Sequence, residues 1–318
     1  MPDSGHTPVL LSETLAALAP RAGDVYLDCT AGRGGHASAV APLLGATGTV
    51  VLCDLDAGNL AFAAERVGAI PHPPRVLTLH ASFAQAPRFL VERGLRADCV
   101  LADLGFASTQ VDEPARGLSF MRDGPLDMRL NPAGGPTAAD LVASMPEAEL
   151  ARLIAEYGEE RRARAVASAI VAARREAPIR TTTRLAEIIR SVVRREPGGI
   201  DPATRTFQAV RIAVNDELGN LEALLEAVDR GARAALAGGD APVGQGDRWL
   251  APGARVAVIT FHSLEDRPVK RAFATVAQAG LVSDLCGVEK ASPAEVAGNP
   301  RAGSAKLRAI VLASEART

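Results

Sequence analysis

The stretch that decides the fold is Val25-Tyr26-Leu27-Asp28-Cys29-Thr30-Ala31-Gly32-Arg33-Gly34-Gly35-His36. Its first residues are of strand type and end in an acid, a glycine cluster follows, and an Ala-rich run of helix type begins behind it. The order of strand, tight loop and helix predicts the βα turn that holds a nucleotide-like ligand at the edge of a parallel sheet. Gly32 and Gly34 let the backbone turn sharply and approach a ligand closely, and the helix start offers free N–H groups.

The glycines alone do not choose between a nicotinamide cofactor and S-adenosylmethionine, because Gly32-x-Gly34-x-x-Ala37 also fits the dinucleotide fingerprint. Two acids favour S-adenosylmethionine. Asp28 closes the first strand, where a carboxylate would meet a cationic amino acid moiety better than a pyrophosphate. Asp54 ends the next strand, where an acid takes ribose hydroxyls. The alternative is a Gly-rich turn in some α/β protein.

Strand and helix patterns alternate from Val25 to about Leu104, which predicts a parallel sheet with right-handed crossovers. After the fourth strand the pattern changes to a long ordered loop (105–135) and then to helices (137–195), with breaks at Pro146, Gly158 and Pro178. We therefore predict an α/β, Rossmann-like domain interrupted after strand four by a helical insertion. The expected strands are 25–29, 49–53, 75–79, 97–102, 255–260 and 307–312, and the first crossover helices are 36–44, 57–67 and 84–93.

These patterns divide the chain into three segments. Residues 1–112 form the first part of the Rossmann-like domain, 113–203 the helical insertion, and 204–318 the second part of the Rossmann-like domain. In the last segment a helix with a regular apolar stripe starts near Thr204, and residues 238–253 indicate a loop.

Composition argues against several classes of protein. No apolar run approaches the length of a membrane span, and residues 1–6 lack the basic start of a signal peptide. None of the four cysteines belongs to a Cys-x-x-Cys pair, so neither a zinc site nor a disulfide framework is indicated. His262 next to Glu265 offers one His and one carboxylate, which is weak evidence for a metal. We expect no metal, no membrane contact and a cytoplasmic location.

The charge distribution says more than the net charge of −2. Eleven Arg and five Glu lie between Arg152 and Arg195, in a segment that reads as helices. Such a basic face suits phosphate contacts with nucleic acid. The alternative is a solvated helix surface in a chain that prefers Arg over Lys. The candidates for phosphate contacts include Arg161, Arg162, Arg174 and Arg175.

Asp103 follows strand four, the position at which methyltransferases acting on exocyclic amines carry a substrate-facing motif. The cytosine amino group is a poor nucleophile because its lone pair is delocalised into the ring. An acceptor that takes one N–H can localise that pair and aim it at the methyl carbon, and positioning supplies most of the effect. We predict Asp103, or a backbone carbonyl beside it, as this acceptor. The alternative is that Asp103 caps a loop.

Two further runs are informative. Arg116–Asn131 mixes three Arg, two Asp and apolar anchors, which is unusual for a linker, although Asp127 and Arg129 could simply pair with each other. In Thr260–Asp266, Ser263 with Asp266 predicts a capping box for the following helix. His262 could line the substrate cleft.

Together these runs resemble one family, RsmH or MraW, the bacterial small-subunit rRNA cytosine N4-methyltransferases. The resemblance implies a class I S-adenosylmethionine-dependent methyltransferase with 16S rRNA as substrate and N4 of a decoding-centre cytidine as target. It also implies cofactor contacts at Gly34, Gly35, His36, Asp54, Phe83, Asp103 and Gln110. The matching runs span nearly the whole chain: His6–Leu11, Gly32–His36, Asp54–Asp56, Arg116–Leu130, Tyr157–Glu160, Thr204–Ile212 and Phe261–Arg267.

The sequence departs from the family pattern at Phe106–Thr109, where a Val-Ser-Ser-Pro type of run is expected, and at Pro268, where an aliphatic residue is usual. The first change touches the substrate side of the cleft, so target choice could differ. Two alternatives stay open: a methyltransferase of the same fold that acts on another RNA, DNA or a small-molecule amine, and a non-catalytic module that binds RNA or a nucleotide. A homodimer is also open.

Overall fold

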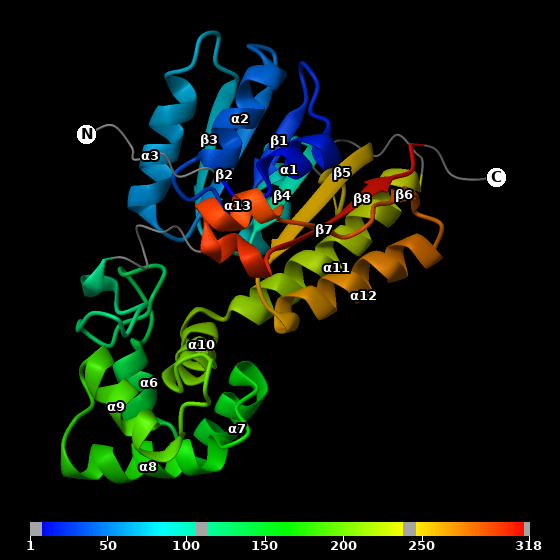
Figure 1. The fold of residues 1–318 in the computed structure, drawn as a ribbon. Coiled ribbons are helices and arrows are strands. Elements are labelled where there is room, and N and C mark those ends of the chain that lie inside the picture. Colours follow the sequence, from blue (N-terminus) through cyan, green and yellow to red (C-terminus); the bar gives the residue numbers. More distant parts are fainter. Residues whose placement is uncertain (1–7, 106–112, 238–245, 315–318) are drawn as a thin grey trace. The chain divides into compact units, whose positions relative to one another are not determined.

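The computed structural model describes residues 8–105, 113–237 and 246–314. The chain divides into two compact units, each of which is described by itself (Figure 1). The sheet unit comprises Met1–Gly105 and Gly219–Thr318, and the helical unit comprises Phe106–Leu218. Gln110 and Phe106–Thr109 lie outside the described residues.

One sheet organises the sheet unit. Within the described residues it has eight strands in the order β3-β2-β1-β4-β5-β8-β6, and β7 pairs with β8. Strands β3, β2, β1, β4 and β5 run parallel, whereas β8 is antiparallel to β5. The strands are β1 Val25–Asp28, β2 Thr49–Asp54, β3 Arg75–His80, β4 Ala97–Asp103, β5 Leu250–Thr260, β6 Val282–Leu285, β7 Glu289–Lys290 and β8 Lys306–Leu312.

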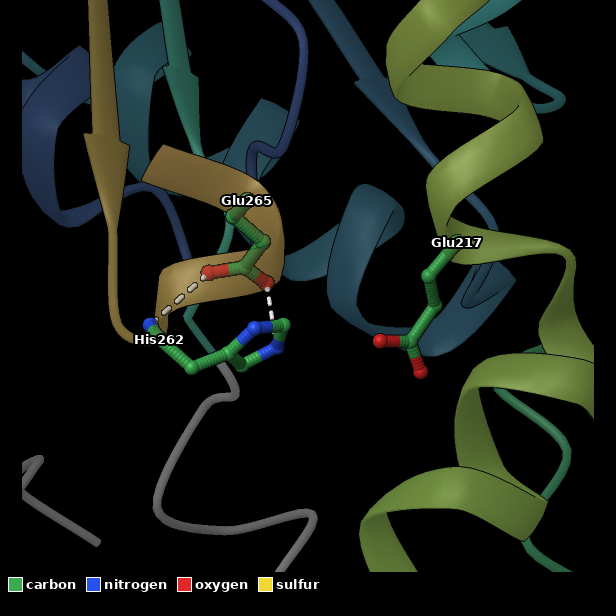
Figure 2. A group of neighbouring side chains, drawn as sticks. All are labelled: Glu217, His262 and Glu265. Carbon is green, nitrogen blue, oxygen red and sulfur yellow. Dashed lines mark hydrogen bonds and ion pairs between the residues drawn. The ribbon is translucent and has the colours of Figure 1, made fainter. Parts of the chain in front are cut away.

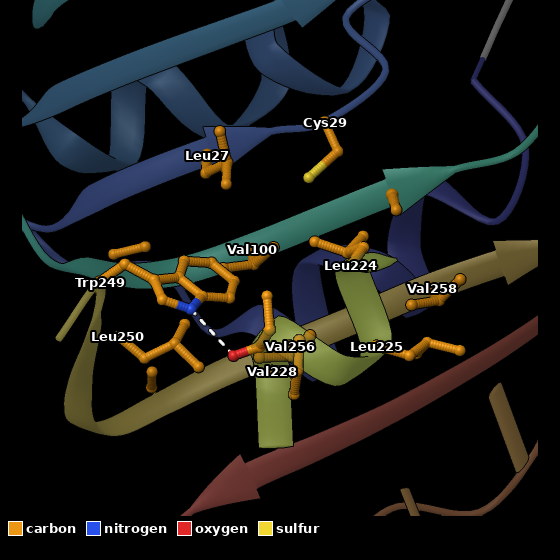
Figure 3. Close-up of a cluster of buried hydrophobic side chains, with 14 of the residues drawn as sticks. Leu27, Cys29, Val100, Leu224, Leu225, Val228, Trp249, Leu250, Val256 and Val258 are labelled. Carbon is orange, nitrogen blue, oxygen red and sulfur yellow. Dashed lines mark hydrogen bonds between the residues drawn. The ribbon is translucent and has the colours of Figure 1, made fainter. Parts of the chain in front are cut away.

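Helices cover both faces of this sheet because successive strand residues point to opposite sides. Leu27 packs in the core with α4, α11 and α12, and its neighbour Tyr26 packs in the core with α1, α2 and α3. Trp249, the only tryptophan in the chain, is fully buried in the first core and its Nε1 donates to the Ala227 carbonyl at 3.0 Å (Figure 3). The elements are α1 Leu11–Leu18, α2 Gly35–Leu44, α3 Ala57–Gly68, η1 Phe83–Gln85, α4 Ala86–Glu92, α11 Glu217–Leu236, α12 Ser263–Gln278, α13 Pro293–Gly298 and η3 Pro300–Ser304.

The helical unit, drawn in green in Figure 1, has a core of its own. Phe207 lies in this core, and its ring meets Phe120 edge-on at 4.8 Å between centroids. A Cβ at Gly158 would stand 2.6 Å from the Arg205 carbonyl oxygen, so glycine is required where the end of α7 meets α10. The elements are η2 Pro114–Arg116, α6 Ala138–Ser144, α7 Glu147–Gly158, α8 Ala163–Glu176, α9 Thr182–Val192 and α10 Ala203–Asn215.

The predicted α/β fold with a helical insertion after strand four is confirmed. The predicted start of β5 is wrong: β5 begins at Leu250, inside the segment expected to be a loop, because Pro252 and Gly253 interrupt its apolar pattern. The helical unit also runs on to Leu218, so α10 lies in it rather than in the last sequence segment, because the α10 stripe packs against α7 and α9. Among helices of the described residues, none combines the length and apolar character needed to cross a bilayer.

Candidate active site

The candidate site lies at the edge of the sheet where adjacent parallel strands end. β1 ends at Asp28, β2 at Asp54 and β4 at Asp103. β1 is hydrogen-bonded to both β2 and β4, so the three acids come to one edge. Ligands of open α/β sheets bind outside these carboxyl ends.

Asp54 ties the glycine loop to the second strand. Its Oδ2 accepts the Gly32 N–H at 2.7 Å, and its Oδ1 accepts the Asp56 N–H at 2.8 Å. Burial raises the pKa of Asp54 above its ordinary value, and these two N–H groups oppose the rise. Each carboxylate oxygen has a second lone pair, so Asp54 can still accept a hydroxyl from a ligand.

The three glycines of the loop differ in what requires them. Gly32 has φ +49°, in the left-handed region. Among the described residues, a Cβ there would come within 4 Å only of the Thr30 carbonyl oxygen, at 3.9 Å, so they leave this side of the loop open. Gly34 also has positive φ, and a Cβ would stand 3.1 Å from Ala63 of α3. At Gly35 a Cβ would stand 2.7 Å from Pro8 Cγ. Close packing therefore explains Gly34 and Gly35, whereas Gly32 leaves space for a ligand.

Asp28 does not face a ligand, contrary to the sequence-based hypothesis. It is 2% exposed, and its carboxylate accepts the Tyr26 hydroxyl at 3.0 Å and the Thr30 N–H at 3.2 Å. Burial raises its pKa to about 6, opposed by the nearby His36 and by the hydrogen bond from Thr30. We assign Asp28 to holding the start of the glycine loop.

Asp103 is positioned by groups from three elements. Its N–H donates to Thr30 Oγ1 at 2.7 Å, and its Oδ1 accepts the Gly105 N–H at 3.1 Å. Its Oδ2 lies 3.6 Å from Nε2 of His36, in the first turn of α2. The Asp103 side chain is 21% exposed, so its carboxylate is fixed but accessible. The loop after β1 thus sets the position of the end of β4, and nothing in the sequence pattern singled out Thr30.

His36 is buried, yet neither of its ring nitrogens has a hydrogen-bond partner in the described part of the chain. Buried polar atoms are normally satisfied, so this ring is a candidate for a ligand or water contact. Phe83 opens η1 directly beyond β3 and packs, partly buried, against the core that contains Leu27. Of the predicted cofactor residues, the structure thus brings Asp54, His36 and Asp103 to one edge.

At the end of β5, His262 and Glu265 contact each other (Figure 2). His262 Nε2 lies 3.0 Å from Glu265 Oε1, and the other carboxylate oxygen accepts the Phe261 N–H at 2.8 Å. The predicted capping box is therefore shifted by one residue: α12 has His262 as its N-cap and Glu265, not Asp266, at the third helical position. Asp266 instead pairs with Arg308 and Lys306 of β8.

The Arg116–Asn131 run folds onto itself within the helical unit. Arg129 donates to both carboxylate oxygens of Asp127 at 2.8 and 2.7 Å, so the simpler interpretation of this pair is confirmed. A Cβ at Gly117 would stand 2.2 Å from the Pro125 carbonyl oxygen. Asn215 of α10 holds the end of the run by accepting from the Leu130 N–H at 2.7 Å.

The basic face of the helical unit is partly used inside the unit. Arg174 donates to the carbonyls of Val142 and Met145 at 2.6 and 2.8 Å, so it satisfies the end of α6 and is a poor phosphate candidate. Arg161, Arg162 and Arg175 are exposed, and their side chains form no hydrogen bond or ion pair among the described residues. These three are the better candidates for phosphate contacts.

The chain matches known proteins over nearly its full length. The sequence model of the MraW methylase family matches residues 3–238 and 241–312. The chain belongs to the MraW methylase family. Ribosomal RNA small subunit methyltransferase H of Rhodospirillum centenum is 45% identical, with 95% of this chain and 91% of the relative covered. The proteins of the same name from Halorhodospira halophila (45% identity; 95% and 93% covered) and Geotalea uraniireducens (42%; 97% and 99%) are similar to the same extent.

The residues at the sheet edge fit S-adenosylmethionine as the family's methyl donor. Among the described residues, the buried ring nitrogens of His36 form no hydrogen bond and Gly32 leaves open space at the loop. Asp54 retains acceptor capacity for ribose hydroxyls. These residues would hold the donor, and the exposed side of Asp103 would face the reacting groups.

Proposed function

We propose that this chain transfers a methyl group from S-adenosylmethionine to N4 of a cytidine in the decoding centre of 16S rRNA. Membership in a methylase family supports methyl transfer, and the names of the relatives support small-subunit rRNA as substrate. The observation that carries the proposal is Asp103: a fixed, accessible carboxylate at the end of β4, anchored to the glycine loop through Thr30.

In this mechanism Asp103 orients the amine. When bound, S-adenosylmethionine supplies an electrophilic methyl carbon. Asp103 Oδ2 accepts one N–H of the cytosine amine, so that the nitrogen lone pair points away from the ring system. The Gly105 N–H holds the carboxylate through Oδ1, and the bond from the Asp103 N–H to Thr30 Oγ1 fixes the Asp103 backbone. A strong base is not required, because the nitrogen becomes acidic once it is alkylated; the work of Asp103 is positioning.

The helical unit supplies the proposed RNA contacts. Arg161 and Arg175 are exposed cations that can neutralise phosphates. We propose that the two outer chain segments, 1–112 and 204–318, hold the cofactor. We propose that the helical insertion, 113–203, recognises RNA. A ribosomal substrate implies a cytoplasmic location. The alternative function is methylation of a different RNA, DNA or a small-molecule amine by the same site.

Asp103→Asn and Asp103→Ala test the mechanism. In single-turnover methyl transfer to purified small subunits, with S-adenosylmethionine saturating, we expect both to slow transfer and Asn to retain more activity than Ala, because Asn keeps an acceptor oxygen. An orienting group acts mainly in the transition state, so RNA affinity should change little. Asp98→Asn is the control, since Asp98 lies at the other end of β4 and binds the Val25 N–H. Parent-rate transfer by both Asp103 variants would make Asp103 structural.

The substrate itself is tested by nucleoside mass analysis of small-subunit rRNA from cells with and without this protein. We expect loss of an N4-methylated cytidine when the protein is absent. An unchanged nucleoside profile would favour the alternative substrates.

A further inference from the structure

A cavity of about 290 Å³ opens at the carboxyl end of β5. Its wall is formed by the end of β5, the start of α12, β7 and the corner between η3 and β8. The polar groups that line it include Thr260, His262, Lys290, Ser304 and Lys306, and none of the described lining residues is acidic. The volume is near the lower end of the range of small-ligand pockets, roughly 300–1,000 Å³.

Two of the three lysines in this chain line the cavity. Lys290 of β7 and Lys306 of β8 are direct partners in the antiparallel pairing of these strands. Residues directly opposite in an antiparallel pair project on the same face, and like charges in this arrangement destabilise it. The strand pairing therefore places two lysines side by side at one cavity, an arrangement that a bound anion would stabilise.

Internal acids do not neutralise this pair. Lys306 Nζ lies 3.1 Å from Asp266 Oδ2, but the same carboxylate also pairs with Arg308 at 2.8 Å. One acid thus serves two cations. Lys290 is exposed and forms no ion pair within the described part of the chain. The balance at the cavity is positive, with a compact ammonium group free to bind an oxyanion.

The cavity lies beside the candidate active site. β5 is the parallel neighbour of β4, and Asp103 is in register with Ile259, directly before the lining residue Thr260. The ring of Phe261 covers the Gly105 backbone, since a Cβ on Gly105 would stand 2.7 Å from it. Gly105 in turn donates to the Asp103 carboxylate. One residue, Phe261, thus forms part of the cavity wall and supports the loop that carries the acceptor.

We propose that this cavity binds a backbone phosphate of the RNA substrate, with Lys290 and Lys306 as its cationic partners and the Ser304 hydroxyl as a further donor. The cavity is larger than a bare phosphate requires, so part of the attached sugar also fits. The inference rests on the proposed function, because it assigns a part of the same substrate to a second place on the same sheet edge. A phosphate held here would fix the register of the RNA strand relative to Asp103.

Lys290→Gln tests the proposal, with Lys270→Gln as a matched control, because Lys270 is the one remaining lysine and is exposed on α12 away from the cavity lining. KM and kcat are measured with unmethylated small subunits at several salt concentrations. We expect Lys290→Gln to raise the subunit KM about two- to fivefold, as for one partly exposed charge pair, with kcat unchanged. The slope of log kcat/KM against log salt should flatten by about 0.7–0.9 for one lost phosphate contact. Lys290→Glu should raise KM further.

Three other results would overturn the proposal, and each is distinct. If Lys290→Gln has the same KM and salt slope as the parent, the cavity does not bind RNA. The proposed function would still stand in that case, because the parent protein methylates small subunits. If calorimetry shows that Lys290→Gln loses the parent's binding of inorganic phosphate while its KM for small subunits is unchanged, the cavity is a site for free phosphate and not for RNA. A parent protein that transfers no methyl group to small subunits would refute the proposed function, and the phosphate assignment with it.

Discussion

Asp28→Asn should change the pH dependence of folding in a defined direction. Burial raises the pKa of Asp28 to about 6 from an ordinary 3.8, a difference of roughly 3 kcal/mol between its two protonation states. The native state therefore binds more protons than the unfolded chain between about pH 4 and 6, so stability falls as pH rises through this window. Asn cannot ionise, and its side chain can still accept from the Thr30 N–H.

We compare the free energy of unfolding of the Asn variant with that of the parent at each pH. The difference, variant minus parent, should grow by up to about 3 kcal/mol as the pH rises from 4 to 7.5. Urea unfolding followed by fluorescence measures it, because the single tryptophan, Trp249, is buried in the sheet unit and reports on that unit. Tyr26→Phe is the opposing test: the Tyr26 hydroxyl lowers the pKa of Asp28, so its loss should extend the pH-dependent fall in stability to higher pH. A parent-to-Asn difference that is constant over this pH range would refute the reasoning.

Two further predictions concern binding. Asp54→Ala removes the carboxylate that accepts the Gly32 N–H and that is proposed to accept the ribose hydroxyls. The affinity for S-adenosylmethionine, measured by calorimetry, should therefore fall about ten- to a hundredfold, or roughly 1.5–3 kcal/mol. Unchanged affinity, or preferential binding of NAD by the parent, would contradict the cofactor assignment. Arg175→Gln should flatten the salt slope of RNA binding by about 0.7–0.9 without loss of stability, whereas Arg174→Gln should lower thermal stability because it frees two carbonyls at the end of α6. If Arg174→Gln flattened the salt slope and Arg175→Gln did not, the phosphate contact would lie at Arg174.

The sheet could be predicted well where strands are continuous apolar runs. The ends of β1, β2, β3, β4 and β8 fall within one residue of the prediction. β1, β2, β4 and β8 are mostly buried apolar runs, and β3, although it is only partly buried, keeps an apolar run of strand type. β6 and β7 were missed. Most of β6 and both residues of β7 are exposed, so neither has an apolar period that could be recognised.

The acids at the strand ends could be predicted as a group, but their individual roles could not. Asp28 and Asp54 end neighbouring strands in the same sequence context, yet Asp28 is enclosed by Tyr26 and Thr30, and Asp54 is tied to Gly32. This difference depends on contacts between segments far apart in sequence. The same holds for the lysine pair of the cavity, whose members become neighbours only through the antiparallel pairing of β7 with β8.

The separate cores of the two units have a thermodynamic consequence. The polypeptide passes from one unit to the other twice, after Gly105 and before Gly219, and the apolar side chains of each unit cluster among themselves. A ligand stabilises only the part of a molecule to which it binds. A small cofactor held at the glycine loop would therefore stabilise the sheet unit, which contains that loop. A single melting midpoint need not describe both units of this chain.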